Sequence, residues 1–285
     1  NYVSGGLAFV TGNISIPSTN GFHKFEYTGQ TNFSIKRFGG ATKLSIDNIS
    51  IKEVTGDQPR LNYDISNGVV QSCPSLLLEP SRSNSITNSD SFGSTGWSFV
   101  TTGTAIAPIV TDDYAISPDG TQNAQRVQFN LGGGTTLTDR TIIRQNIGSQ
   151  TDWFLSVYMK STNGGEQKIL WHVGGDVNET VVTGEWKRYT FNRNGVTNSW
   201  AGLGLRGSVS SVDTADILVY GFQAEQGSYA TSLIPTNGSS QTRAAETCND
   251  AGTSSTFNST ECVLYAEIKA LANDLTNRRI TISDG

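Results

Sequence analysis

The residues that could do chemistry in this chain are few, and their types favour binding over catalysis. Only two histidines occur, His23 and His172, and no Gly-x-Ser-x-Gly motif is present to carry a serine nucleophile. A nucleophilic hydrolase needs a Ser or Cys beside a positioned base. Because the two histidines lie in different predicted modules, the sequence predicts no catalytic triad.

Acidic residues gather in one region without the context of a glycosidase. Such an enzyme needs two carboxylates about 5–10 Å apart. The four candidates lie in the turn-rich segments GGEQ and GGDVNETVVTGE. They are Glu166, Asp176, Glu179 and Glu185. We interpret them as solvated turn carboxylates and expect no enzyme activity from the chain.

A second acidic cluster could hold a metal ion. The segment DDYAISPDGTQN contains Asp112, Asp113 and Asp119, and calcium prefers oxygen ligands gathered in loops. A structural Ca²⁺ site on these three residues is therefore one hypothesis. The alternative is ordinary Asp-rich turns, with Ser-Pro-Asp-Gly as a type I or II turn.

Binding of a sugar needs aromatic faces and planar polar groups, and strand alternation provides candidates for both. In WFLSVYMK, Tyr158 and Lys160 share the strand face opposite to the apolar one. His172 of KILWHV and Arg206 of LGLRG are predicted to point outward in the same way, whereas Trp171 points into the core. One concave sheet face carrying all four polar residues would suit a polar ligand such as an acidic sugar. The alternative is that they only solvate the sheet.

The remaining tryptophans are interpreted as packing residues. Trp97, Trp186 and Trp200 are each assigned to core or edge packing in preference to a ligand platform.

The composition specifies the elements that must position these side chains. Charged residues make up 16% of the 285 residues and apolar ones 35%, with 31 glycines, a profile typical of an all-β protein with many turns. The net charge of −5 argues against a nucleic-acid partner. No apolar run approaches the ~20 residues that span a bilayer, so no membrane insertion is expected.

The spacing of the apolar runs predicts β-sandwich modules of the jelly-roll type in tandem, with truncated modules at both ends. Nine short runs between residues 75 and 247 are separated by Gly, Asn, Asp and Ser clusters. Residues 25–54 resemble 187–227 in the order of their strands, which indicates an internal repeat. The predicted domains are a partial jelly roll at 1–54, a connector at 55–72, a complete sandwich at 73–248, a linker at 249–262 and the first hairpin of another module at 263–285. We interpret the chain as a piece of a longer one.

The end of the complete module is predicted to pack against the sandwich and not to form a flexible tether. GSYATSLIPTNGSSQTR at 227–243 contains Tyr229, Leu233 and Ile234, which are too apolar for a free tether. We expect it to fold back over the sandwich and to return beside the module's entry at Cys73. Because the ends of a domain often lie close together, a Cys73–Cys248 disulfide is one reading of these cysteines. Small buried thiols are the other.

Five segments resemble parts of known families. CPSLLLEPSRSN (73–84), ISPDGTQNAQRV (116–127) and GFQAEQGSYATSLIPTNGSSQTRAAE (221–246) resemble a module of phage tail-fibre and tail-spike proteins. SIDNISIKEV (45–54) looks like the last strand of carbohydrate-binding jelly rolls. VLYAEIKALANDLTNRRITISDG (263–285) is similar to the first hairpin of concanavalin A-like lectin modules.

The resemblance implies three alternative functions. The first is a non-catalytic adhesion module of a phage tail fibre or spike, on the virion tail or otherwise extracellular. It would be a homotrimer or a partner of other tail proteins, and would face a cell-surface or extracellular polysaccharide. The second is a carbohydrate-binding array of a secreted polysaccharide-degrading enzyme. The third is an architectural spacer.

Overall fold

The computed structural model describes residues 75–173, 178–195 and 197–247, together with short strands before residue 75 and with residue 268. The chain divides into two compact units, residues 1–54 and 55–285. Every helix or strand assigned among these described residues is a β-strand, as the composition predicts. No helix in this part of the chain is long and apolar enough to cross a membrane.

The first unit contains one small antiparallel sheet of order β2-β1-β3. Its strands are β1 (Gly6–Phe9), β2 (Ser15–Ile16) and β3 (Ile35–Phe38). Strand β3 lies within the segment FSIKRF (33–38).

Two small strand pairs precede the main fold of the second unit. Strand β4 (Arg60–Asn62) pairs with β7 (Ser75–Leu77), and β5 (Ile65–Ser66) pairs with β6 (Val69–Val70). Strands β4, β5 and β6 all lie in the segment predicted as a connector, 55–72. The pairing of β4 with β7 joins the predicted connector to the first strand of the predicted sandwich.

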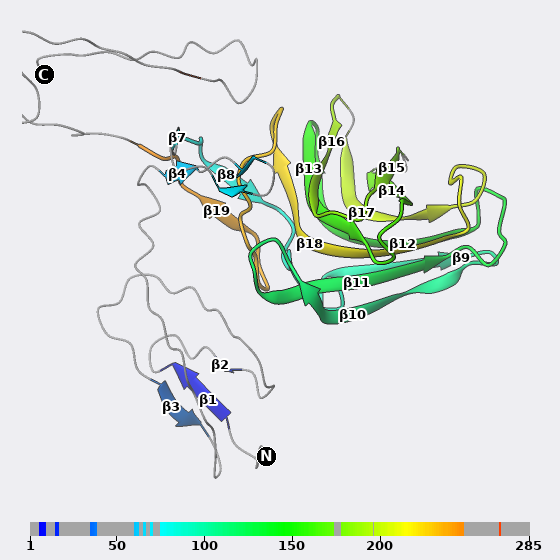
Figure 1. Ribbon diagram of the computed structural model, residues 1–285, viewed down its shortest axis with the longest axis horizontal. Coiled ribbons are helices and arrows are strands. Elements are labelled where there is room, and N and C mark those ends of the chain that lie inside the picture. Colours follow the sequence, from blue (N-terminus) through cyan, green and yellow to red (C-terminus); the bar gives the residue numbers. More distant parts are fainter. Residues whose placement is uncertain are drawn as a thin grey trace, which may run out of the picture. The chain divides into compact units, whose positions relative to one another are not determined.

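Two five-stranded antiparallel sheets make up the main fold, a β-sandwich (Figure 1). The first sheet has the order β10 (Ile106–Ile116), β11 (Gln122–Asn130), β18 (Thr214–Gln226), β13 (Trp153–Ser161), β16 (Lys187–Arg193). The second has the order β15 (Glu179–Val182), β14 (Gln167–Val173), β17 (Asn198–Arg206), β12 (Arg140–Gln150), β9 (Trp97–Thr102). Strands that follow one another in the chain mostly belong to different sheets, which is the Greek-key connectivity of a jelly roll.

The core lies between the two sheets and follows the predicted alternation. On β13 every second residue is fully buried, and β14 and β17 contribute matching rows from the opposite sheet. These inward rows contain Leu155, Val157 and Met159 of β13, Ile169, Trp171 and Val173 of β14, and Ala201, Leu203 and Leu205 of β17. The inward position predicted for Trp171 is therefore confirmed.

Aromatic rings fill one end of this core. Trp97 lies 4.7 Å from Phe92 and 5.5 Å from Phe222 between ring centroids, so its predicted packing role is confirmed. Trp171 stacks on Phe191 at 5.9 Å and meets Phe222 edge-on. Edge-to-face and offset contacts of this kind add to the free energy of burial.

The segment at 227–243 closes the sandwich, as the sequence predicts. Strand β19 (Gln241–Arg243) pairs with β8 (Arg82–Asn84), and Ile234 is buried. The side-chain amide of Asn84 donates to the carbonyls of Phe222 and Ile234, so it ties the incoming strand to both later segments. We refer to residues 227–247 as the clasp.

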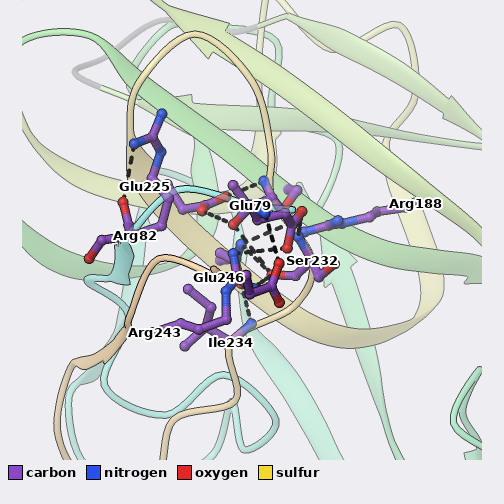
Figure 2. A network of polar contacts seen from close by, with 12 residues as sticks. Glu79, Arg82, Arg188, Glu225, Ser232, Ile234, Arg243 and Glu246 are labelled. Carbon is purple, nitrogen blue, oxygen red and sulfur yellow. Dashed lines mark hydrogen bonds and ion pairs between the residues drawn. The ribbon is translucent and has the colours of Figure 1, made fainter. Parts of the chain in front are cut away.

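Buried charges fix the clasp in place (Figure 2). Arg243 forms an ion pair with Glu79 at 3.0 Å, and its guanidinium also donates to the carbonyl of Ser232. Glu79 accepts from the backbone amide of Ser232, while Glu246 accepts from that of Glu79. Hydrogen bonds to ionised carboxylates are stronger than those between neutral groups, so this network holds the two ends of the module together. Cys73 and Cys248 lie outside the described residues.

Candidate functional site

The four predicted ligand-binding residues do not share one surface. Tyr158 and Lys160 lie on β13 of the first sheet, whereas His172 on β14 and Arg206 on β17 belong to the second. All four alternate with core residues and therefore point away from the core. Because the two sheets pack face to face, their outer surfaces look in opposite directions. The single concave site predicted from the sequence is thus wrong, because two of its residues lie on each outer surface of the sandwich.

The outer surface of the first sheet, which we call the tyrosine face, has side chains that bond to one another. Tyr158 and Tyr220 have ring centroids 6.1 Å apart, and the guanidinium of Arg188 lies 5.6 Å from the Tyr158 ring. Arg188 also donates to the hydroxyl of Ser156 at 2.8 Å. Arg126 binds Asp216 in a bidentate pair of 2.9 and 2.5 Å. Most polar groups of this face therefore already have partners.

The tip of the β10–β11 hairpin lies across the tyrosine face. The hydroxyl of Tyr220 donates to Asp119 in the hairpin turn at 2.9 Å, and Tyr220 is only 7% exposed. The indole of Trp186, just before β16, donates to the carbonyl of Ile116 at 3.1 Å. Because β10 and β16 are opposite edges of the sheet, this bond joins the two edges over the outer surface.

The three aspartates predicted to bind calcium do not form a metal site. Asp119 accepts hydrogen bonds from Ser117, Thr121 and Asn123 as well as from Tyr220. Partial burial opposes its ionisation, but the hydrogen bonds outweigh that and lower the pKa of Asp119. Within the described residues no three His, Cys, Asp or Glu side chains are grouped so that they could hold a metal ion. The predicted calcium site is therefore wrong, and the alternative reading as an Asp-rich turn describes the segment.

The outer surface of the second sheet carries a different set of residues. We call it the arginine face and define it by Arg140, Arg144, His172, Trp200 and Arg206. The register of β14, β17 and β12 places His172, Gly202 and Arg144 in one row across the sheet. Arg140, four residues before Arg144 on β12, lies directly opposite Arg206 of β17.

Two glycines on β17 let the neighbouring strand approach closely at the centre of the arginine face. A Cβ added at Gly202 would clash with the backbone oxygen of Ile143 and with Arg144, and one at Gly204 would clash with the backbone of Thr141 and Ile142. The central strand therefore has no outward side chains between Trp200 and Arg206. This absence leaves room for the arginines of β12 to lie over the strand.

The Arg144 guanidinium is fixed by an aromatic ring and an imidazole. Its carbon lies 4.1 Å from the centroid of the Trp200 ring, and one nitrogen lies 3.3 Å from Nε2 of His172. Since a guanidinium only donates, Nε2 is the acceptor. The Nε atoms of Arg140 and Arg144 are buried and have no hydrogen-bond partner in the described part of the chain. Such groups cost free energy unless something binds them.

Burial, together with the charges of the arginine face, keeps His172 neutral. Burial lowers the pKa of His172 to about 4, and the positive charges of Arg144, Arg140 and Arg206 add to the effect. Burial also lowers the pKa of Arg144, with Arg140 contributing as a like charge. Arg206 donates to the backbone carbonyl of Leu137. A small recess lined by Ile142, Leu170, His172, Gly204, Leu205 and Arg206 lies beside these side chains.

Sequence reasoning found His172 and Arg206 but missed three members of this face. Arg140 and Arg144 lie on the run that was recognised only as an apolar strand, TIIRQNI and the residue before it. Their even spacing opposite to Ile143 and Ile147 is the signal that could have found them. Trp200 was assigned to packing, yet it alternates with Ala201 and therefore points outward.

Comparison with known proteins gives distant similarities of structure. No protein-family model and no curated protein sequence matches the chain. A family 11 carbohydrate-binding module from Clostridium thermocellum is 12% identical with a TM-score of 0.36, over 56% of this chain and 98% of that one. The enzymatically active domain of tailspike protein 4 from bacteriophage CBA120 is 13% identical with a TM-score of 0.32, over 50% of this chain and 21% of that one. The assignment as a β-sandwich rests on the two sheets described above.

Proposed function

We propose that this chain is a non-catalytic carbohydrate-binding module and that its arginine face contacts the sugar. The observation that carries the proposal is the Arg140–Arg144 pair, whose buried Nε atoms have no partner in the described part of the chain. Planar donors beside an aromatic ring are the groups that bind sugar hydroxyls and the apolar side of a sugar ring. Arg144 and Trp200 supply both within 4.1 Å.

The tyrosine face is the weaker candidate because most of its polar side chains bond to one another, although the Nε of Arg188 has no hydrogen-bond partner in the described part of the chain. Arg126 is paired with Asp216, and Tyr220 lies under the hairpin turn and donates to Asp119. A ligand there would have to displace these bonds or the hairpin tip. The arginine face needs no such displacement at Arg140.

The buried carboxylates support a binding role without catalysis. The buried acids of the described residues each accept a backbone amide hydrogen; they are Glu79, Asp139, Glu225 and Glu246. A general acid or nucleophile must instead reach a substrate. These groups are used to hold the fold together.

We also propose that the chain is part of an extracellular adhesion protein, namely a phage tail fibre or tail spike. The segments at 73–84 and 221–246 support it, since they resemble the module found in such proteins. The proposal includes a homotrimeric assembly, which light scattering after size exclusion tests. A monomer together with glycan binding would favour the array of a secreted polysaccharide-degrading enzyme instead.

A glycan array probed with the full 285-residue chain tests the function. We expect binding that is lost in Arg144→Ala and retained in Lys160→Ala, because Lys160 lies on the opposite face and serves as the matched control. Binding lost in Lys160→Ala and kept in Arg144→Ala would move the site to the tyrosine face. If the chain bound no neutral or acidic glycan, the architectural spacer would be the remaining hypothesis for its function.

A further inference from the structure

We infer that the arginine face selects an acidic sugar residue, whose carboxylate or sulfate is bound between Arg140 and Arg144. This inference rests on the proposed function and names the chemical class of its ligand. It starts from the positive charges of Arg140 and Arg144, which no carboxylate in the described part of the chain pairs with.

The guanidiniums are placed against one another on neighbouring strands. Arg140 and Arg206 are directly opposite in the β12–β17 ladder, an arrangement that is destabilising for like charges. Arg144 lies on the same face of β12, and neither Arg140 nor Arg144 has an ion pair with a carboxylate in the described part of the chain. An oxyanion seated between them would remove this repulsion.

The acidic residues nearest to the face are turned toward other partners. Asp139, next to Arg140 in the sequence, accepts hydrogen bonds from Thr104 and Thr136 and organises a loop. Glu179 on the edge strand β15 binds Ser211 and Lys168. Neither carboxylate is therefore available as an internal counter-ion for Arg140 or Arg144.

The Arg144 guanidinium is oriented before any ligand arrives. Stacking on Trp200 fixes its plane, and His172 takes one of its five donors. The planar fork of an arginine matches the two oxygens of a carboxylate or sulfate. Little side-chain freedom would be lost on binding, which favours affinity.

The net charge of the whole chain favours an acidic sugar over a nucleic acid as the ligand. A phosphate backbone carries closely spaced charges and needs a broad basic surface, whereas this chain has a net charge of −5. Three arginines on two strands fit one or two oxyanions. An acidic polysaccharide offers such isolated charges, with neutral sugar rings between them.

His172 provides a direct reporter of anion binding. The groups that face it are Arg144 and Arg140 on β12 and Arg206 on β17, with Lys168 on its own strand and Glu179 on β15. A bound oxyanion offsets the arginine charges and must raise the pKa of His172. The linkage also requires that the acidic ligand binds more tightly as the pH falls.

The decisive experiment is an NMR titration of both histidines in the full chain. We expect galacturonate and galactose 6-sulfate to raise the His172 pKa by about half a unit or more, and galactose to leave it unchanged. His23 is the internal control for ionic strength. The variant Arg140→Gln should lose the ligand-induced shift while its unliganded spectrum shows a folded protein.

The results of this titration test the acidic ligand and the carbohydrate-binding function independently. Equal binding of oligogalacturonides and neutral galacto-oligosaccharides, with no shift at His172, would overturn the acidic ligand and keep the carbohydrate-binding function. Failure of all neutral and acidic sugars would overturn both. A shift at His172 with binding at least about tenfold tighter for the acidic oligosaccharide supports both.

Discussion

Arg243 and Glu79 form an ion pair of 3.0 Å between residues 164 positions apart, with side chains only 14% and 4% exposed. The pair joins the last strand of the module to the segment that enters it. Glu246, three residues after Arg243, makes a second connection by accepting the amide hydrogen of Glu79. The two ends of the sandwich are therefore bound to each other by charge as well as by the short β8–β19 ladder.

Breaking this pair should destabilise the whole module. In Arg243→Met the carboxylate of Glu79 stays buried without its cation, and such a loss costs about 3–5 kcal/mol of unfolding free energy. Urea denaturation followed by tryptophan fluorescence measures it. Lys168→Met is the matched control, because its pair with Glu179 is more exposed and should contribute less than about 1 kcal/mol. Equal effects of the two variants would show that the clasp is dispensable.

Truncating Trp171 should be nearly as damaging. Its ring is 1% exposed, stacks on Phe191 and donates through its indole to Thr180, so Trp171→Ala should cost about 3–5 kcal/mol. Calorimetry gives the change in melting temperature. Trp186→Ala removes a ring of the same size that is only partly buried and should cost clearly less. Unchanged melting of the Trp171 variant would contradict the assignment of the β14 faces.

Local pattern in the sequence was sufficient for the strands but not for the sheets. Alternation correctly separated Leu155 and Trp171 from Tyr158 and His172, because side-chain direction depends only on position along a strand. Which sheet a strand joins depends on pairing with distant segments, such as β14 with β17 and β13 with β18. The predicted site therefore combined residues from two opposite surfaces.

The turn at Asp119 shows a second reason why sites are hard to predict. Its aspartates looked like ligands because oxygen-rich loops bind calcium. The carboxylate of Asp119 is instead used by the turn itself and by Tyr220, which is 101 residues away. A hydrogen-bond partner so distant in the chain produces no local sequence pattern from which it could be predicted.

Asp119 should accordingly stabilise the hairpin tip whether or not calcium is present. Asp119→Ala leaves the buried hydroxyl of Tyr220 without its acceptor, and we expect a loss of about 1–3 kcal/mol. Hydrogen exchange of residues 115–123 should rise. The same melting temperature shift in calcium and in EDTA is expected. A shift seen only in calcium would restore the metal site.

Adding a methyl group at Gly202 tests the close approach of β17 and β12. In Gly202→Ala the new Cβ meets the Ile143 carbonyl, so the strands must separate, at a cost of about 1–3 kcal/mol or more. Gly165→Ala is the control, since its nearest neighbour would be 3.5 Å from the added atom. Glycan binding should weaken with the first variant only. A Gly202→Ala protein of normal stability would show that the strands are further apart.

The pH dependence of stability follows from the neutral state of His172. Its pKa is about 4 in the folded chain and 6.5 as the ordinary value, so the unfolded state takes up the proton first. Stability is therefore complete above pH 6.5 and is lost as the pH falls toward 4. The loss from this residue reaches about 2 kcal/mol at pH 5, at 1.36 kcal/mol per pKa unit.

His172→Gln separates this contribution from the carboxylates that titrate at lower pH. The amide oxygen can still accept from Arg144, but nothing there takes up a proton, so the variant should lose the slope between pH 6.5 and 5. Urea denaturation at half-unit steps measures it, with His23→Gln as the control that keeps the slope. A wild-type slope that survives in His172→Gln would mean that the imidazole is not held neutral by Arg140, Arg144 and Arg206. The electrostatic basis of the acidic-sugar site would then be lost with it.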